Sequence, residues 1–246
     1  MSLLFFTASG WKGLVFLLFT ALTIWLGGLQ LVKLEADSAA RRKAPGISKD
    51  EKKAIKAQAV RRKKCLVAAV LTANFLVLGY FKYWSYFAEL LSGAFSATAP
   101  SSLGLVMPLG ISFYTFQSMG YLLDVYNGKY APQKNLARFA LFVSFFPQLI
   151  QGPIGRYDQL EKQLESGGHV NVPRAFLLML WGLFKKMVVA DRALAAVCAV
   201  FDAPGGTWGG AMAVVGVLAY SVQQYCDFSG GIDLVAGIAE LFGIRL

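Results

Sequence analysis

The sequence GLVFLLFTALTIWLGGLQLV, residues 13–32, lies between Lys12 and Lys33 and decides the class of fold. These 20 residues carry no charge. About 20 residues, each rising about 1.5 Å along a helix, are needed to cross the apolar core of a bilayer. A secretory signal peptide has a shorter apolar core and a small-residue cleavage site, so a cleaved signal is the weaker alternative. Residues 1–32 are therefore predicted to contain a retained first transmembrane helix.

The composition of the whole chain also favours a membrane protein. Of its 246 residues, 56% are hydrophobic and 15% are charged, whereas soluble domains average about 45–50% and about 25%. The three cysteines lie far apart without C-x-x-C spacing, which gives no disulfide framework and no zinc pattern. A single histidine excludes a multi-histidine metal site within this chain. We expect no metal site and no bound cofactor.

A basic segment follows the first apolar stretch. Residues 33–64 contain 12 of the 24 Lys and Arg and four of the 14 Asp and Glu, so they carry +8 of the net charge of +10. Excess Lys and Arg in short loops marks the cytoplasmic side of a membrane. We interpret residues 33–64 as a basic cytoplasmic loop with a solvated helix near 49–53, available to anionic lipid headgroups. No nucleic-acid partner is expected, because nucleic-acid-binding domains spread such charge over a folded face.

Further apolar stretches predict several crossings. Residues 65–81 form a second span that ends among aromatic residues, as membrane interfaces favour. Residues 90–123 are uncharged but too long for one simple crossing, and Pro100 and Pro108-Leu109-Gly110 break them. We predict a broken or re-entrant part followed by a span from about 109 to 123. Non-helical backbone at membrane depth is tolerated only where protein or a water-filled cavity surrounds it, which implies a cavity or tunnel.

The second half of the chain has less regular apolar stretches. Residues 139–155 contain two prolines and two glycines near their far end and are predicted to form a hairpin that dips into the membrane. Lys185 and Lys186 follow a mostly apolar segment and are typical of the cytoplasmic end of a helix. A span is expected at about 210–225, and Gly230-Gly231 is expected to break the segment that follows.

Polar residues in apolar surroundings are the candidates for chemistry, because such groups in membrane segments face a protein interior or an aqueous path. The hydroxyls and amide of residues 112–117 are interpreted as links between packed helices. Gln148, Gln151 and Arg156 lie in a bent, proline- and glycine-rich segment and can present donors to a ligand carbonyl or carboxylate. An interfacial turn with a snorkelling arginine is the alternative.

Three other groups offer weaker support for catalysis. Lys185 and Asp191 are six residues apart, as are Asp227 and Asp233, and this spacing does not place two side chains on one helix face. Paired-carboxylate catalysis is therefore not supported. His169 follows two glycines in a polar loop and is interpreted as solvated. Without further comparison, the residues indicate a polytopic membrane protein with an internal polar path.

Over residues 75–246, the order and spacing of several motifs resemble the membrane-bound O-acyltransferase superfamily. The resemblance is greatest to its bacterial branch that O-acetylates alginate and other exopolysaccharides, which is related to the teichoic-acid D-alanylation protein. The motifs that carry it are Leu78–Tyr83, Pro108–Gln117, Tyr121–Gly128, Phe145–Arg156, Gly182–Lys186 through Ala190-Asp191, and Asp227–Gly230 with Asp233.

This resemblance implies an all-α, multi-pass protein of the bacterial cytoplasmic membrane, with broken or re-entrant helices around a tunnel. It implies transfer of an acetyl-type group from a thioester donor, acetyl-CoA or an acyl carrier protein. The acceptor would be a hydroxyl of a cell-envelope polysaccharide, or an extracytoplasmic acetyltransferase partner that completes the transfer. The residues carried over as tunnel or scaffold candidates are Gln148, Arg156, Asp191, Asp227 and Asp233.

The sequence departs from the family pattern at the catalytic histidine. In the family this residue lies C-terminal to the motif that corresponds to Asp227–Gly230, whereas His169 lies upstream and does not match it. We expect residues 65–246 to be the N-terminal part of the acyltransferase core, inactive alone, with the catalytic histidine beyond Leu246. A transporter or channel built on the same broken helices, or a scaffold half that works with a separate catalytic chain, are the alternatives.

Overall fold

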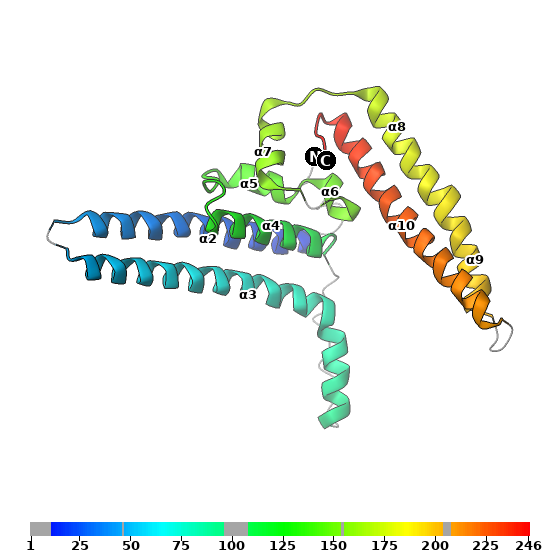
Figure 1. The fold of residues 1–246 in the computed structure, drawn as a ribbon, viewed down its shortest axis with the longest axis horizontal. Helices are drawn as coiled ribbons and strands as arrows, with labels where there is room; N and C mark the ends of the chain where they lie inside the picture. Colours follow the sequence, from blue (N-terminus) through cyan, green and yellow to red (C-terminus); the bar gives the residue numbers. More distant parts are fainter. Residues whose placement is uncertain (1–10, 46, 96–107, 154, 204–207) are drawn as a thin grey trace. The chain divides into compact units, whose positions relative to one another are not determined.

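The structure, a computed structural model, describes residues 11–45, 47–95, 108–153, 155–203 and 208–246. Every regular element among these residues is a helix (Figure 1). The chain forms two compact units, Met1–Leu149 with Arg156–Asp158, and Ile150–Gly155 with Gln159–Leu246. The all-α class predicted from the sequence is confirmed.

Two long helices make up most of the first unit. α2 (Trp11–Lys43) and α3 (Lys49–Phe95) pack against each other as an antiparallel hairpin (Figure 1). Both are long and apolar enough to cross a membrane, over Gly13–Lys43 and Lys49–Trp84. The first two predicted spans are therefore helices in the structure.

A polar link joins the apolar parts of these two helices. The buried Asn74 side chain of α3 donates from Nδ2 to Thr23 Oγ1 of α2 at 3.1 Å and to the Val70 carbonyl at 2.9 Å. Hydrogen bonds of this kind connect transmembrane helices, because apolar packing alone does not favour a neighbouring helix over lipid. The contact fixes the register of the hairpin.

Helix covers most of residues 33–64, and the solvated helix predicted near residues 49–53 is the first part of α3. α2 continues to Lys43 and α3 begins at Lys49. Ala, Lys, Arg, Glu and Gln dominate the segment, and these residues favour helix, whereas Pro45 lies between the two helices. An excess of Lys and Arg indicates on which side of a membrane a segment lies. It says little about the backbone conformation of that segment. The cytoplasmic placement stays a prediction.

Shorter helices complete the first unit. α4 (Ile111–Tyr126) covers most of the span predicted at 109–123. Its start is fixed by Gly110, whose φ of 69° is the left-handed conformation that glycine adopts most easily. Of the preceding part that we predicted to be broken or re-entrant, residues 90–95 continue α3, and residues 96–107, with Pro100, lie outside the described residues. α5 (Leu136–Val143) begins at Asn135, whose side-chain oxygen accepts from Ala137 N at 2.8 Å as an N-cap.

Two further short helices follow, α6 (Phe146–Gln151) and α7 (Tyr157–Ser166). The segment for which we predicted a membrane hairpin, residues 139–155, therefore contains most of α5 and all of α6, with a break at Ser144-Phe145. The two prolines lie at different kinds of position. Pro147 is in the first turn of α6, where a missing N–H is tolerated, and Pro153 lies after the helix ends.

The second unit is built from two antiparallel helical rods. One rod is continuous and consists of α8 (Val172–Leu183), the π-helix η1 (Phe184–Ala190) and α9 (Asp191–Phe201). The other is α10 (Gly210–Leu241), which packs along all three parts of the first rod (Figure 1).

Glycines allow these two rods to approach closely. A Cβ on Gly182 would lie 2.6 Å from the Gly230 carbonyl oxygen, and one on Gly230 would lie 2.7 Å from the Gly182 carbonyl oxygen. A Cβ on Gly237 would meet the Ala175 carbonyl oxygen at 2.7 Å. Small residues at helix contacts are typical of membrane proteins, since they let backbones come together.

The same glycines explain a second correction. We expected Gly230-Gly231 to break the chain after a span ending near Tyr225, but α10 runs unbroken to Leu241. A glycine inside a helix costs only about 1 kcal/mol relative to alanine. Here the absence of a side chain also allows α10 to lie close to α8. The predicted span at 210–225 is the first half of this longer helix.

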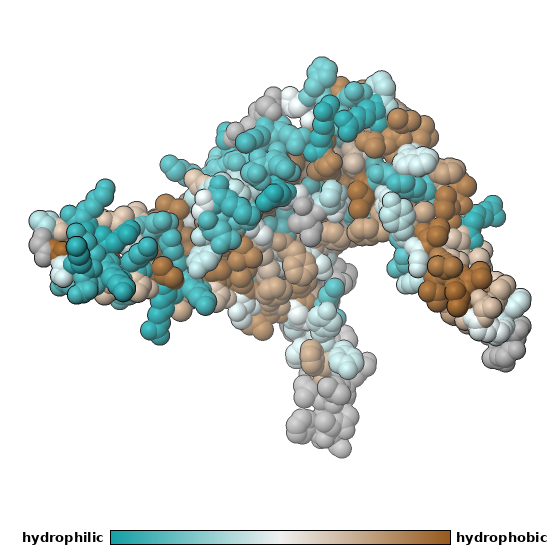
Figure 2. Space-filling view, viewed as in Figure 1, coloured by the Kyte–Doolittle hydropathy of each residue, from teal (hydrophilic) through white to brown (hydrophobic). Residues whose placement is uncertain are grey.

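Both rods of the second unit expose large apolar side chains. Figure 2 shows apolar surface along α9 and α10, whereas the α2–α3 connection is hydrophilic. Leu177 is 69% exposed and Leu218 is 62% exposed. Contiguous apolar surface of this extent marks contact with lipid or protein, which agrees with an all-α membrane fold.

Candidate functional site

Two adjacent lysines of η1 hold two aspartates of α10. Lys185 Nζ donates to Asp233 Oδ2 at 2.6 Å and to Ser229 Oγ at 2.7 Å. Lys186 Nζ forms a very short ion pair with Asp227 Oδ1. These five side chains form what we call the lysine–aspartate cluster, and all lie in the second unit.

The π-helix allows both lysines to reach the same partner helix. A π-helix closes i→i+5 hydrogen bonds and is rare, and it occurs frequently at functional sites. Successive residues on such a turn are separated by a smaller rotation than in an α-helix, so Lys185 and Lys186 both reach α10. Lys185 also lies 5.6 Å from the ring centre of Trp181, at a cation–π distance.

The position of the cluster corrects our interpretation of the lysines as the end of a helix. They lie near the middle of the continuous rod from Val172 to Phe201. The Lys185 side chain is only 16% exposed and that of Asp233 is 22% exposed. Paired ionisable residues in the middle of apolar segments are costly and mark substrate paths or active sites.

A pocket opens beside the outer ion pair. It has a volume of about 600 Å³ and is lined by amide, carboxylate, hydroxyl and aromatic side chains. Asp227 belongs both to this pocket and to the ion pair with Lys186, so the two features are continuous. Its lining residues are Gln151, Gln224, Tyr225, Asp227, Phe228, Ser229 and Ile232.

The first unit has a separate buried polar contact. Gln117 Nε2 of α4 donates to Gln148 Oε1 of α6 at 3.2 Å and to the Phe142 carbonyl at 3.3 Å. Both glutamines are nearly fully buried, and Gln148 Nε2 has no hydrogen-bond partner among the described residues. The contact links α4 to α6, as we predicted for the amide within residues 112–117.

A tyrosine network lies between α4 and α5. The backbone N–H of Gln133 donates to Tyr121 Oη at 2.7 Å, and Gln133 Nε2 donates to Tyr157 Oη at 3.0 Å. Burial and the neighbouring Asp124 carboxylate raise the pKa of Tyr130 well above its usual range. Tyr130 therefore keeps its proton, and the network is a neutral support for the connection between the helices.

The structure brings together only two of the five predicted site residues. Asp227 and Asp233 belong to the lysine–aspartate cluster. Gln148 is buried in the first unit, and Arg156 and Asp191 are exposed. His169 is exposed in the connection before α8. In the described part of the chain, no group of three or more His, Cys, Asp or Glu is arranged to hold a metal ion.

Three residues of the lysine–aspartate cluster are not among the site residues predicted from the sequence. The sequence pattern of Lys185 and Lys186 is typical of a helix end, and it indicates no role for Ser229. A usable signal existed for the serine, because Ser229 and Asp233 are four residues apart and therefore share a helix face.

Comparison with known proteins identifies the family. The chain is 35% identical over 184 residues to a probable alginate O-acetylase AlgI of Pseudomonas aeruginosa, which covers 71% of the chain. The chain belongs to the membrane-bound O-acyltransferase family. It is 32% identical over 205 residues to a peptidoglycan O-acetyltransferase of Helicobacter pylori, and 30% identical over 149 residues to a teichoic acid D-alanyltransferase of Lacticaseibacillus rhamnosus.

These matches cover 72% and 56% of the chain. The chain spans about a third of the length of the relatives it matches, with 34%, 38% and 36% of each covered. No protein-family model matches the chain. Membership of the O-acyltransferase family therefore rests on the relatives, and it agrees with the resemblance inferred from the motifs.

Proposed function

We propose that this chain is part of a membrane O-acyltransferase that moves an acetyl-type group onto hydroxyls of a cell-envelope polysaccharide. The observation that carries the proposal is the lysine–aspartate cluster in the middle of the second unit's rods, beside an open pocket. The related O-acetylases of alginate and peptidoglycan support the reaction class and the kind of acceptor.

The reaction proposed is acyl transfer from a thioester, supplied by acetyl-CoA or an acyl carrier protein. The acceptor hydroxyl oxygen attacks the thioester carbonyl, the carbon–sulfur bond breaks, and the hydroxyl proton passes through a base to the departing thiolate. The acceptor is the glycan itself or an extracytoplasmic partner that completes the transfer. The basic α2–α3 connection supports placing the donor on the cytoplasmic side of the bacterial cytoplasmic membrane.

The cluster is assigned a positioning role in this reaction. Lys185 is held by both Asp233 and Ser229, whereas the Lys186–Asp227 pair lies at the pocket with side chains 43% and 34% exposed. The inner pair fixes α10 against η1, and the outer pair can hydrogen-bond a polar group that enters the pocket. The base is proposed to be a histidine outside residues 1–246, because exposed His169 does not match the family position.

The experiment uses the full-length protein. Purified protein in lipid nanodiscs is incubated with isotope-labelled acetyl-CoA or acetyl carrier protein and with an envelope polysaccharide fraction, and ester-linked label is counted. Transfer to glycan or to an added partner supports the proposal. Absence of transfer together with passage of a solute through proteoliposomes would establish the transporter alternative. Sequencing of the gene beyond the codon for Leu246 tests the position of the histidine.

A further inference from the structure

The basic end of the α2–α3 hairpin is an ordered helical structure. Lys63 Nζ of α3 and Glu35 Oε2 of α2 form an ion pair of 2.8 Å across the two helices. The start of α3 is capped, because the backbone N–H of Ser48 donates to Glu51 Oε2 at 2.9 Å and that of Asp50 donates to Ser48 Oγ at 3.4 Å. The charges of this segment therefore lie on a defined surface.

The charge divides into two groups along the hairpin. The hairpin base, next to the apolar parts of the helices, consists of Lys33 and residues 61–64. The hairpin tip has net charge +5, with seven basic and two acidic residues between positions 41 and 56. Six of the seven basic residues are exposed and Arg42 is half-buried. Those seven residues are Arg41, Arg42, Lys43, Lys49, Lys52, Lys53 and Lys56.

The hairpin tip extends away from the apolar parts of its two helices. α2 and α3 continue unbroken from their apolar parts into the tip (Figure 1), so the tip extends along the same direction as the spans. At the α-helical rise, Arg41 is about 12 Å beyond Lys33, and Lys52 is about 18 Å beyond Lys64. The Debye length is about 8 Å at physiological salt. If the hairpin base lies at the headgroups, the tip lies more than one Debye length farther out, where the charge of the lipid is largely screened.

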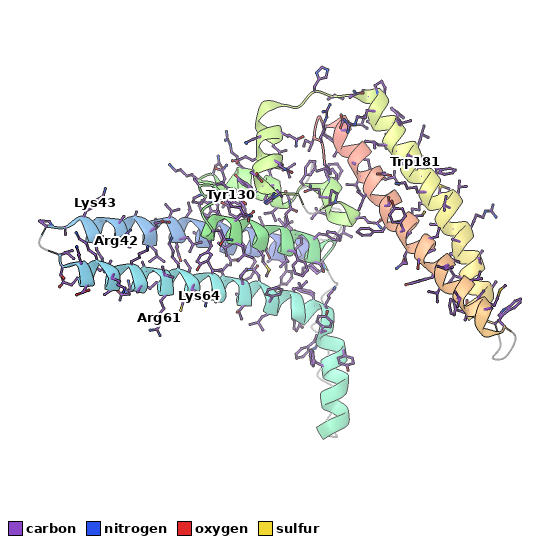
Figure 3. The ribbon with its side chains drawn as sticks, viewed as in Figure 1. Arg42, Lys43, Arg61, Lys64, Tyr130 and Trp181 are labelled. Carbon is purple, nitrogen blue, oxygen red and sulfur yellow. The ribbon has the colours of Figure 1, made fainter. Side chains whose placement is uncertain are left out.

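The space between the two helices does not fit a small anionic ligand. The cavity there has a volume of about 40 Å³, about enough for one or two water molecules. Arg41 and Arg62 lie at this cavity from opposite helices, together with the acidic Asp37. Figure 3 shows Lys43 on α2 and Arg61 on α3 extending from the hairpin, whereas Arg42 donates from Nε to the Ser38 carbonyl of its own helix at 3.2 Å. The basic side chains therefore form an extended surface on the outside of the hairpin.

We propose that the hairpin tip is a docking surface for a soluble protein with an acidic face. Opposite charge steers such a partner to the surface and raises the association rate. Asp50 and Glu51 lie among the basic residues of the tip, where they repel the continuous phosphates of a nucleic acid but can pair with single basic residues of a protein. The inference rests on the proposed cytoplasmic side of the hairpin and does not require acyl transfer.

The first test measures binding with a matched pair of variants. The tip variant changes Lys49, Lys52, Lys53 and Lys56 to Gln, and the base variant changes Lys33, Arg61, Arg62 and Lys64 to Gln. The base variant loses the same charge and keeps the Lys63–Glu35 pair. Full-length protein in nanodiscs of uncharged lipid is titrated with a Glu-rich peptide, an oligonucleotide, and vesicles containing phosphatidylglycerol.

We expect the peptide to bind the wild-type protein with an affinity that weakens steeply with salt. The affinity should fall about tenfold in the tip variant and change less than about twofold in the base variant. Equal loss in the two variants, or tighter binding of the oligonucleotide than of the peptide, would overturn the proposal. Binding that appears only with phosphatidylglycerol would assign the surface to lipid instead. Because no step uses acyl transfer, failure here leaves the proposed enzyme function untouched.

The second test identifies the partner in cells. A photo-crosslinking amino acid replaces the exposed Ala54 in the tip, or Val60 near the base as a control. The proposal expects adducts with a soluble acidic protein at Ala54. The purified form of that protein should bind the wild type and lose about tenfold affinity for the tip variant. Adducts only with lipid, or a partner that binds the tip variant as well as it binds the wild type, would contradict it.

Discussion

Lys185 of η1 and Asp233 of α10 form an ion pair with Nζ and Oδ2 2.6 Å apart, although 48 residues separate them in the chain. The neighbouring Lys186 holds Asp227 in the same way. Asp227 and Asp233 do not share a face of α10, and each is paired with a lysine of η1. Both ion pairs join α10 to η1, and the outer pair lies at the pocket.

Replacement of one member of the inner pair should destabilise the protein more than replacement of one member of the outer pair. Lys185→Met leaves Asp233 without its cation, at a position where its side chain is only 22% exposed. A double-mutant cycle with Asp233→Asn should give a coupling free energy on the order of 1–3 kcal/mol. The cycle of Lys186→Met with Asp227→Asn is the control, and its more exposed pair should give less than about 1 kcal/mol.

Thermal unfolding of the full-length protein in detergent measures both cycles. Equal coupling in the two cycles, or coupling near zero for the inner pair, would show that burial does not govern these interactions.

Adding a methyl group between the two rods of the second unit should be costly. Gly182→Ala places a Cβ 2.6 Å from the Gly230 carbonyl oxygen, so the rods must separate. We expect a loss of about 1–3 kcal/mol in the free energy of unfolding. Gly79→Ala in α3 is the control, since nothing lies within 4 Å of its Cβ position. That variant should be neutral or more stable by up to about 1 kcal/mol, because alanine favours helix.

The left-handed turn before α4 gives a second comparison between glycines. Gly110 and Gly128 have φ values of 69° and 74°, so alanine at either position costs about 1–2 kcal/mol in backbone strain. Only Gly110→Ala also meets a neighbour, the Leu149 carbonyl oxygen at 2.7 Å. Gly110→Ala should therefore lower the unfolding temperature more than Gly128→Ala does. Identical shifts would mean that α6 moves freely away from this turn.

The buried amides of the first unit should respond unequally to substitution. Gln117→Leu removes the donor to Gln148 Oε1 and leaves a buried oxygen without its partner, at a cost of about 1–3 kcal/mol. Gln148→Leu removes an amide whose nitrogen already lacks a partner, while Gln117 Nε2 keeps the Phe142 carbonyl at 3.3 Å. Its cost should be less than about 1 kcal/mol by chemical denaturation. A larger loss of acyl transfer than of stability in Gln148→Leu would instead place Gln148 at a ligand.

The sequence predicted the positions of three helices and the family of the protein. Uncharged stretches at 13–32 and 65–81 are parts of α2 and α3, and the span predicted at 109–123 largely coincides with α4. These predictions succeed because length and absence of charge are local properties. The O-acyltransferase motifs were recognisable for the same reason, since their order and spacing can be read along the chain.

Contacts between helices were not accessible in this way. The six-residue spacing of Asp227 and Asp233 correctly argued against a pair on one helix, but it contains no information about lysines on another. The π-helix at residues 184–190 shifts the register by one residue, and nothing in its composition indicates that shift. Gly230 and Gly231 were misread as a break because their role depends on the backbone of α8.

If this chain is part of an O-acyltransferase that acts on the cell envelope, as proposed, then loss of its gene must lower the acetylation of envelope polysaccharide. The most direct measurement is the content of ester-linked acetyl on envelope polysaccharide in a strain that lacks the full gene. We expect the content to fall, to return with the wild-type gene, and to stay low with Asp227→Asn present at wild-type protein level. An acetyl content unchanged by loss of the gene under conditions of polysaccharide synthesis would contradict the account.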